Sequence, residues 1–405
     1  ETVGLRVRLE TRVSAKTRIE VVTEGVFTRM IHDDPELSGV AAVLFDEFHE
    51  RSLDGDLGLA LALDAQAALR EDLRLLVMSA TLDGERLSQW LQAPLLQSRG
   101  RSFPVATQYR PCPRDRYPDQ HICQVILEAL RNEPGSLLVF LPGMREIRAV
   151  QRRLEESPLP DAVQIHVLHA SLPKEQQQAA LIPAPAPLRK VVLATNVAET
   201  SITIEDVRVV IDSGEARVAR YDERRGMNHL HTEMISAASA EQRRGRAGRT
   251  QAGVCYRLWG ESRQTSLKAF SDPDMLTTDL QPIALELAQW GVRDLNELTL
   301  LDQPPEDRLQ RARAAGDQAA RARALLGLAR SAMRRSELGR CRRFVDIAST
   351  CVEPSADVVL WMKVLNFRGW IELSQGHMSA ALEPITAVVG RPVSTELQPA
   401  AAPEL

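Results

Sequence analysis

The chain has 405 residues, of which 44% are hydrophobic and 26% are charged, and its formal net charge at pH 7 is −4. This length exceeds one ordinary domain and predicts two or three, and the composition is that of a globular chain. No run of about 18 apolar residues occurs, so we expect no membrane-spanning helix and no membrane partner. The weak negative charge argues against a protein that simply coats nucleic acid.

From residue 17 to residue 259, short β-branched or aliphatic runs alternate with longer amphipathic segments. Continuous apolar strands separated by helices are typical of parallel sheets that are covered on both faces. We therefore predict an α/β fold, with strands at residues 18–22, 40–45, 73–78, 136–140, 163–167, 190–194 and 207–211.

A break in this alternation predicts a domain boundary. Residues 97–113 contain Pro104, Pro111 and Pro113, which interrupt strand and helix patterns alike. We predict one α/β domain over residues 1–100 and a second over residues 101–259.

Beyond residue 259 the pattern becomes helical, and we predict an all-α region in two parts, 260–305 and 306–405. The first part begins with a helix at residues 280–290. In the second part, helix pairs expected at 319–333 with 336–348 and at 356–374 with 378–389 resemble helical-hairpin repeats, although two copies alone do not establish a repeat. Arginines in this part either contact nucleic acid or form a solvated helix face.

The five cysteines are an odd number without C-x-x-C spacing. This pattern predicts reduced thiols in a cytoplasmic protein, with neither a zinc site nor disulfides. Since the first residue is Glu1, any signal peptide would lie outside this sequence.

Two acids and a histidine follow the predicted strand at 40–45. Ligands of open α/β sheets bind at the carboxyl ends of strands. Asp46 is therefore placed to hold Mg²⁺ through water, and Glu47 to activate an attacking water, with His49 close by. A solvated acidic turn is the alternative interpretation.

Ser79 and Thr81 follow the next predicted strand, at 73–78. In a parallel sheet their loop can lie beside that of Asp46 and Glu47, where the two hydroxyls can hydrogen-bond the carboxylates. Ser-Ala-Thr is a common turn sequence, so this prediction rests only on its position after the strand that follows Asp46 and Glu47.

Residues 242–249 read Gln-Arg-Arg-Gly-Arg-Ala-Gly-Arg. Small residues let the end of a helix approach a neighbouring surface, while projecting guanidinium groups suit phosphate oxygens and the charge growing on a transferred γ-phosphate. A solvated helix face is the alternative. Thr195 and Asn196, after the strand at 190–194, can bond phosphate or sugar, or simply form a helix N-cap.

The order and spacing of these clusters closely resemble the DEAH-box helicases of superfamily two, in particular the bacterial HrpB-type ATP-dependent helicases, over about residues 1–305. Phe48 stands where the usual DEAH box has alanine. The matching segments are motif Ib (23–25), motif II (46–49), motif III (79–81), motif IV (138–147), motif V (195–204) and motif VI (242–249).

The resemblance implies two RecA-like lobes, the first incomplete, followed by the all-α region. ATP and Mg²⁺ would bind between the lobes, and single-stranded or partly duplex RNA or DNA would cross them. Asp46 and Glu47 would position Mg²⁺ through water, Glu47 would also be the catalytic base, and Gln242 would place the lytic water. The remaining nucleotide contacts would come from His49, Ser79, Thr81 and the arginine fingers Arg246 and Arg249. His49 would also couple the first lobe to motif VI.

The same resemblance assigns nucleic-acid contacts. Residues 213–234 look like a hairpin that is inserted at the duplex junction, with Arg217, Tyr221 and Gly226 in it. The strand itself would be contacted by Thr23, Glu24, Gly25, Thr195 and Asn196.

One family feature is missing, because no G-x-x-x-x-G-K-[ST] sequence occurs in the 405 residues. Such a loop grips the β- and γ-phosphates, so the chain alone is expected to be inactive. Residues 1–4 resemble sequence that follows this loop in the family, and we therefore expect a truncated helicase. The rival hypothesis is a catalytically inactive remnant that binds nucleic acid or protein through its helical C-terminal region.

Overall fold

The computed structural model divides the chain into two compact units. The first unit comprises residues 1–220, 229–278 and 294–303, and the second comprises 221–228, 279–293 and 304–405. The structure describes residues 2–7, 10–80, 84–98, 103–185, 187–199, 204–222, 227–292, 297–310, 325, 326, 329, 338–352 and 358–374.

The N-terminal part of the first unit, called lobe 1 below, contains two small sheets. One has the strand order β2-β1-β3, formed by β1 (Val3–Val7), β2 (Glu10–Arg12) and β3 (Ile19–Val22). The other pairs β4 (Ala42–Phe45) in parallel with β5 (Arg74–Val77). The helices of lobe 1 are α1 (Glu24–Asp33), α2 (Leu53–Ala68) and α3 (Gly84–Leu91).

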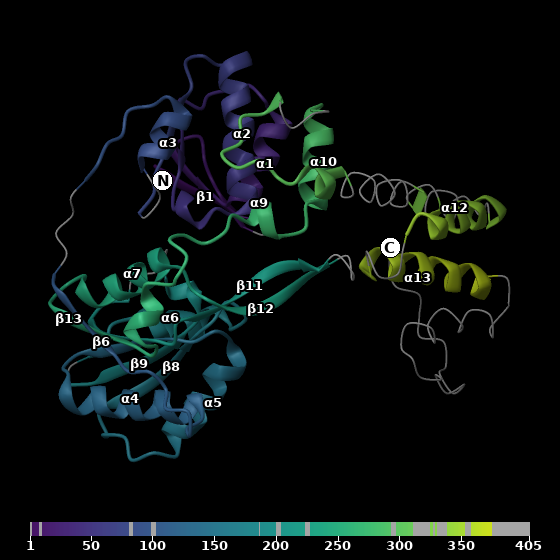
Figure 1. Ribbon diagram of the computed structural model, residues 1–405. Helices are drawn as coiled ribbons and strands as arrows, with labels where there is room; N and C mark the ends of the chain where they lie inside the picture. The colour runs from purple at the N-terminus through teal and green to yellow at the C-terminus, as the bar shows by residue number, and fades with distance from the viewer. Residues whose placement is uncertain are drawn as a thin grey trace. The chain divides into compact units, whose positions relative to one another are not determined.

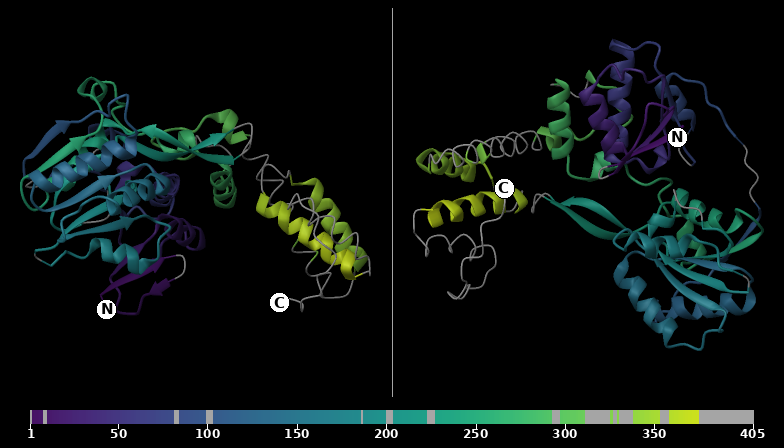
Figure 2. Two further views of the ribbon diagram at one scale, coloured as in Figure 1. Left: turned by 90° about the horizontal axis from the view of Figure 1, so that it is seen from below. Right: turned by 180° about the vertical axis from the view of Figure 1, so that it is seen from behind.

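Helices α1 and α2 lie side by side in lobe 1 (Figures 1 and 2). Phe27 of α1 meets Phe45 of β4 edge to face, with ring centroids 5.5 Å apart. A Cβ atom at Gly58 of α2 would lie 3.2 Å from the Phe27 ring, so a larger residue would crowd this contact. Glycine at this position thus lets α2 approach the aromatic pair.

The strands of lobe 1 are covered less than predicted. Leu44 of β4 is 57% exposed and Leu76 of β5 is 45% exposed, while their sequence neighbours Val43 and Leu75 are half-buried. Because side chains alternate between the faces of a strand, one face of this pair is open to solvent. The expectation of a sheet covered on both faces is therefore wrong for β4 and β5.

The second part of the first unit, called lobe 2, is built on one six-stranded sheet. Its strand order is β6-β13-β10-β7-β9-β8, and all its neighbouring strands are parallel. The strands are β6 (Val105–Tyr109), β7 (Ser136–Phe140), β8 (Val163–Leu168), β9 (Arg189–Ala194), β10 (Val207–Asp212) and β13 (Gly253–Arg257).

Helices cover both faces of this sheet, as predicted (Figure 1). Leu137 and Val139 of β7 pack with α4 (Pro118–Asn132) and α5 (Met144–Glu155). Leu138 and Phe140 point to the opposite face, where α6 (Lys174–Leu181) packs. All residues of β7 are buried, which explains why its sequence is continuously apolar rather than alternating.

All seven predicted strands form, with ends that differ by at most two residues. The sequence prediction missed β1, β2, β6 and β13, which are short and contain few consecutive apolar residues. The hairpin expected over 213–234 is present as a separate two-stranded sheet of β11 (Glu215–Asp222) and β12 (Met227–Met234). Gly226 lies outside the described residues.

A buried ion cluster joins β10 to helix α7 (Ala237–Gly245) in lobe 2. The Arg243 side chain is 1% exposed; its Nε donates to Glu199 over 2.8 Å and its Nη1 to Asp212 over 2.9 Å. The guanidinium also lies 4.8 Å from the ring centroid of Phe140. Burial raises the pKa of Asp212, and the charge of Arg243 opposes that rise.

The second unit contains three described helices. These are α10 (Gln281–Trp290), α12 (Leu338–Thr350) and α13 (Val358–Ser374). Helix α10 matches its predicted range and ends at Gly291, whose φ of +86° is the left-handed conformation common after helices. Helices α12 and α13 pack through a shared core that includes Val345 and Val364.

Two of the predicted hairpin-repeat helices are therefore present as α12 and α13. Their expected partners at 319–333 and 378–389 lie almost wholly outside the described residues, so the repeat remains a prediction. The predicted domain boundaries also remain predictions. All five cysteines are free thiols. Within the described part of the chain, no helix has both the length and the apolar character needed to cross a bilayer.

We expect Arg243→Met to cost about 3–5 kcal/mol of lobe 2 stability, because two buried carboxylates would lose their shared partner. Arg244→Met is the matched control: Arg244 is 33% exposed and pairs with the exposed Glu241, so its loss should cost no more than about 1 kcal/mol. Native-state hydrogen exchange at the amides of β7 and β9 measures both values. Equal losses in the two variants would contradict this account of the cluster.

Candidate functional site

The carboxyl ends of β4 and β5 meet at one edge of their sheet, as predicted. Asp46 and Glu47 follow β4, and the Phe48 amide donates to the carbonyl of Met78, after β5, over 3.0 Å. The Asp46 carboxylate accepts the Glu47 amide at 2.9 Å. The two predicted motif loops are thus adjacent, with an exposed Asp46 at their edge.

The hydroxyls predicted to join this cluster are not both visible. Ser79 is exposed in the loop after β5, and Thr81 lies outside the described residues. The Ala80 amide, next to Ser79, lies 3.4 Å from Nδ1 of His49 and so also links the two loops. Hydrogen bonds from Ser79 and Thr81 to the carboxylates stay predictions.

His49 connects lobe 1 to lobe 2. The amide nitrogen of Gln242, on α7, lies 2.6 Å from Nε2 of His49, where it can donate a hydrogen bond. On its other side, Nδ1 of His49 lies 3.4 Å from the Glu47 carboxylate. The imidazole is nearly buried. Its two contacts join the acidic turn (residues 46–50) to the arginine-rich segment 242–249.

Arg246 and Arg249 are close enough to Glu47 to interact with its charge. Burial lowers the pKa of Arg246 to about 10, the charge of Arg249 adds to this fall, and Glu47 opposes it. Burial also lowers the pKa of Arg249, again against Glu47. Arginine stays protonated at neutral pH, so both side chains are cations whose charges interact with that of Glu47.

The sequence suggested that the arginines of segment 242–249 project from it, but two of the four are buried. Arg243 is in the core, and Arg246, in the 3₁₀ turn η3 (Arg246–Gly248), is buried and donates to the carbonyl of Glu199. Arg249 is exposed. Arg243 and Arg246 therefore form hydrogen bonds within lobe 2, while the charges of Arg246 and Arg249 interact with that of Glu47.

The glycines of this segment also differ from one another. A Cβ atom at Gly248 would lie 2.6 Å from the carbonyl oxygen of Phe103, so only glycine fits there. Gly245 has open space around the same position. The expected close approach is confirmed for Gly248 and is wrong for Gly245.

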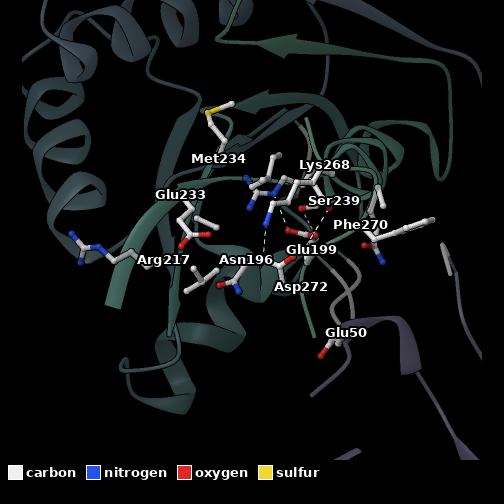
Figure 3. A pocket seen from close by; sticks show the side chains of 18 of the residues that line it. Glu50, Asn196, Glu199, Arg217, Glu233, Met234, Ser239, Lys268, Phe270 and Asp272 are labelled. Carbon is white, nitrogen blue, oxygen red and sulfur yellow. Dashed lines mark hydrogen bonds and ion pairs between the residues drawn. The ribbon is translucent and has the colours of Figure 1, made fainter. Parts of the chain in front are cut away.

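Thr195 and Asn196 line an open pocket of about 1050 Å³ in the first unit. They follow β9, Thr195 is buried, and Asn196 begins the 3₁₀ turn η2 (Asn196–Ala198). In Figure 3, Glu199 and Ser239 lie side by side in this pocket, and Glu50 reaches it from a separate part of the ribbon. The rest of the predicted motif V, residues 200–203, lies outside the described residues.

The β11–β12 hairpin contributes basic side chains to the same pocket. Arg217 of β11 pairs with Glu146 over 3.2 Å, and a Cβ atom at Gly143 would come within 2.7 Å of its guanidinium. Arg220 pairs with Glu233 over 2.6 Å. These arginines are half-buried and already matched by acids, which limits the free positive charge that they offer to a ligand.

Thr23, Glu24 and Gly25 are exposed at the N-terminus of α1. The Glu24 carboxylate accepts the Ser52 hydroxyl at 2.6 Å, and burial raises its pKa. Ser52 also caps α2 by accepting the Gly55 amide. Glu24 therefore links the starts of two helices, and its predicted contact with nucleic acid stays untested.

The sequence prediction missed four residues that organise this region: Arg51, Glu199, Asp212 and Arg243. Each is a charged residue that is buried in the structure. Their charge suggests a solvated position, and only their places within or next to the recognised motifs could have drawn attention to them.

The comparisons with known proteins agree with this geometry. Residues 119–251 match the family model described as "Helicase conserved C-terminal domain". The chain is 50% identical over 306 residues to the ATP-dependent RNA helicase HrpB of Escherichia coli, covering 75% of this chain and 38% of that protein. It is 37% identical over 311 residues to the ATP-dependent RNA helicase HrpA homolog of Haemophilus influenzae, covering 76% of this chain and 24% of that protein.

Solved structures give the same result. A crystal structure of the Escherichia coli DEAH/RHA helicase HrpB matches with a TM-score of 0.76 and 40% identity, over 98% of this chain and 48% of that one. A second, described as the DExH-box NTPase HrpB, matches with a TM-score of 0.73 and 41% identity, over 93% of this chain and 45% of that one. The likeness supports the predicted RecA-like fold, and the chain spans less than half the length of these relatives.

We expect Gly248→Ala and Gly245→Ala to change stability in opposite directions. The first should cost about 1–3 kcal/mol, because the added methyl meets a backbone carbonyl. The second should stabilise by about 0.4–1 kcal/mol, because a helical position with open space gains a residue with less freedom when unfolded. Thermal unfolding followed by circular dichroism compares them, and midpoints shifted in the same direction would refute this explanation.

Proposed function

We propose that this chain, which belongs to the HrpB-type DEAH-box helicases, forms part of an ATP-dependent helicase acting on RNA. The observation that carries the proposal is the contact of Gln242 with His49, which brings the segment of Arg246 and Arg249 beside the turn that holds Glu47, at the end of β4. A base and two cations around one point suit the transfer of a γ-phosphoryl group to water. The hydrogen bond between His49 and Gln242 would keep the arginines of lobe 2 close to Glu47 of lobe 1.

In this proposal Glu47 accepts a proton from the attacking water, and Gln242 orients that water. Arg246 and Arg249 stabilise the negative charge that grows on the phosphoryl oxygens. In the described structure Nη2 of Arg246 donates to the Glu199 carbonyl, so movement of this guanidinium toward a phosphate oxygen would pull on that bond. Binding of nucleotide would thereby act directly on the loop that contains Thr195 and Asn196.

Mg²⁺ fits the residues present. This ion commonly keeps several waters and takes one or two carboxylates plus substrate phosphates. Asp46 is exposed, with one oxygen fixed by the Glu47 amide, so it can offer its other oxygen to a hydrated ion. When bound, Mg²⁺ would neutralise charge on the phosphates, and Asp46 with Glu47 would hold its water shell.

The nucleic-acid partner would be single-stranded or partly duplex RNA, with DNA as the alternative. The names of the relatives, both RNA helicases, support RNA. Thr195 and Asn196 line the large pocket with hydroxyl and amide groups suited to the sugar-phosphate backbone, which favours weak sequence preference. We also propose a cytoplasmic location, from the reducing environment suggested by the cysteines.

The decisive measurement is ATP hydrolysis with and without single-stranded RNA. It compares the 405-residue chain, a version extended upstream to include a phosphate-binding loop, and the extended version with Glu47→Gln. We expect RNA-stimulated turnover from the extended protein only, and a fall in kcat on the order of 10²–10⁴-fold in Glu47→Gln, because the general base is lost.

Glu71→Gln provides the matched control, since Glu71 is an exposed acid in a turn of the same lobe. Its turnover should equal that of the unsubstituted protein. An extended protein that hydrolyses no ATP but still binds RNA would refute the motor and leave the binding remnant as the function. If single-stranded DNA binds and stimulates ATP hydrolysis as much as RNA does, the choice of RNA over DNA is wrong.

A further inference from the structure

The buried guanidinium of Arg51, just after the acidic turn, lies at the centre of a second ion cluster. Its Nε and Nη2 each donate to Asp56 over 2.9 Å, and Nη2 also donates to Asp302 over 2.7 Å. The other oxygen of Asp302 accepts Arg86, on α3, over 2.9 Å. Two acids and two arginines thus balance, and Asp302 comes from a segment 251 residues away in sequence.

An apolar contact accompanies this cluster. Phe48 is buried with Leu59 of α2 and Leu87 of α3, and Leu301 packs against the same group. The Arg51 guanidinium lies 5.7 Å from the centroid of the Phe48 ring. Adjacent residues 301 and 302 therefore hold the acidic turn by two different means, one apolar and one ionic.

The backbone of that turn needs to be held. Glu47 and Arg51, which flank the 3₁₀ turn η1 (Phe48–Glu50), both have a φ of +51°. Left-handed conformations at residues other than glycine cost on the order of 1–3 kcal/mol each and persist only where surrounding contacts impose them. The side-chain contacts of Arg51 and Phe48 hold the turn in this conformation. The direction of the Glu47 side chain depends on the conformation of the turn.

We propose that Leu301 and Asp302 form a latch that positions Glu47, acting through Phe48 and Arg51. This inference rests on the proposed function, because it takes Glu47 as the base. Asp302 is a positioning residue and touches no reacting group. The orientation of the catalytic base then depends on a segment that follows α10, so docking of residues 298–302 on lobe 1 is a condition for turnover.

The charge state of Asp302 agrees with this role. Burial alone would raise its pKa, but the hydrogen bonds from Arg86 and Arg51 lower it overall. Asp302 is therefore ionised at neutral pH, and the neutral amide of Asp302→Asn removes the charge without changing the size of the side chain.

The first test uses hydrogen exchange on the 405-residue chain and needs no ATPase activity. The Phe48, Glu50 and Arg51 amides are each bonded within or beside the turn. In Asp302→Asn we expect them to exchange about tenfold faster, with the interior of α2 and the strands of lobe 2 unchanged. Asp161→Asn, at an exposed turn, is the matched control and should leave all rates unchanged.

The second test measures kinetics in the extended protein. Asp302→Asn should lower kcat on the order of 10–100-fold while the KM for ATP changes little, because a displaced base slows chemistry more than binding. Asp302→Glu should restore part of kcat, because it returns the charge. A protein that is inert without any substitution refutes the proposed function, and the exchange measurement still decides whether the latch holds the turn.

Three results would overturn the latch. Unchanged exchange at the turn would show that Asp302 does not hold it. Faster exchange with an unaltered kcat would show that the turn does not position the base. Faster exchange throughout α2 and β5 would show a general loss of stability, so that Asp302 would have a structural role only.

Discussion

The burial of one guanidinium group, that of Arg243, constrains most of lobe 2. An unpaired charge in a protein interior is so costly that its partners must be placed accurately. Glu199 comes from the loop after β9, Asp212 ends β10, and Arg243 lies on α7. Satisfying this one cation therefore fixes the loop, the strand and the helix relative to one another.

This constraint also links the two roles proposed for the lobe, which are nucleotide binding and nucleic-acid binding. Glu199 binds Arg243 through its carboxylate and Arg246 through its backbone carbonyl, and it follows Thr195 and Asn196 closely in sequence. The Asp212 carboxylate also accepts the amide of Gly214, at the start of the β11–β12 hairpin. A shift of Arg246 toward a nucleotide would thus be transmitted to the loop and hairpin through atoms that are already bonded.

Much of the fold was predictable because buried strands have recognisable runs of apolar residues. The apolar run Leu137–Phe140 of β7 is typical of a strand that is covered on both faces of its sheet. Strand β6 was harder to see, because Thr107 and Gln108 interrupt its apolar residues next to the prolines of the predicted boundary. For β4 and β5 the apolar runs were recognised correctly, but sequence could not tell that one face lacks a covering layer among the described residues.

The site was predictable in its residue types and less so in their connections. Asp46, Glu47 and Gln242 are identified by their order along the chain, and the family resemblance implies that His49 couples lobe 1 to motif VI. That the residue it meets there is Gln242 is visible only in three dimensions. Arg51 and Arg243 look like surface charges in the sequence, because their partners are 5 to 251 residues away. Long-range ion pairs leave no periodic signal, so sequence patterns do not reveal them.

The open face of β4 and β5 affects how the molecule behaves in concentrated solution. Leu44 and Leu76 present aliphatic surface to water there, and β3 adds the exposed Ile19 and Val21. Leaving such a side chain in water forgoes about 1.5–3 kcal/mol of burial energy, which any self-association that covers it would recover. These exposed strand surfaces therefore favour self-association of the chain, and the formal net charge of −4 offers little repulsion between copies.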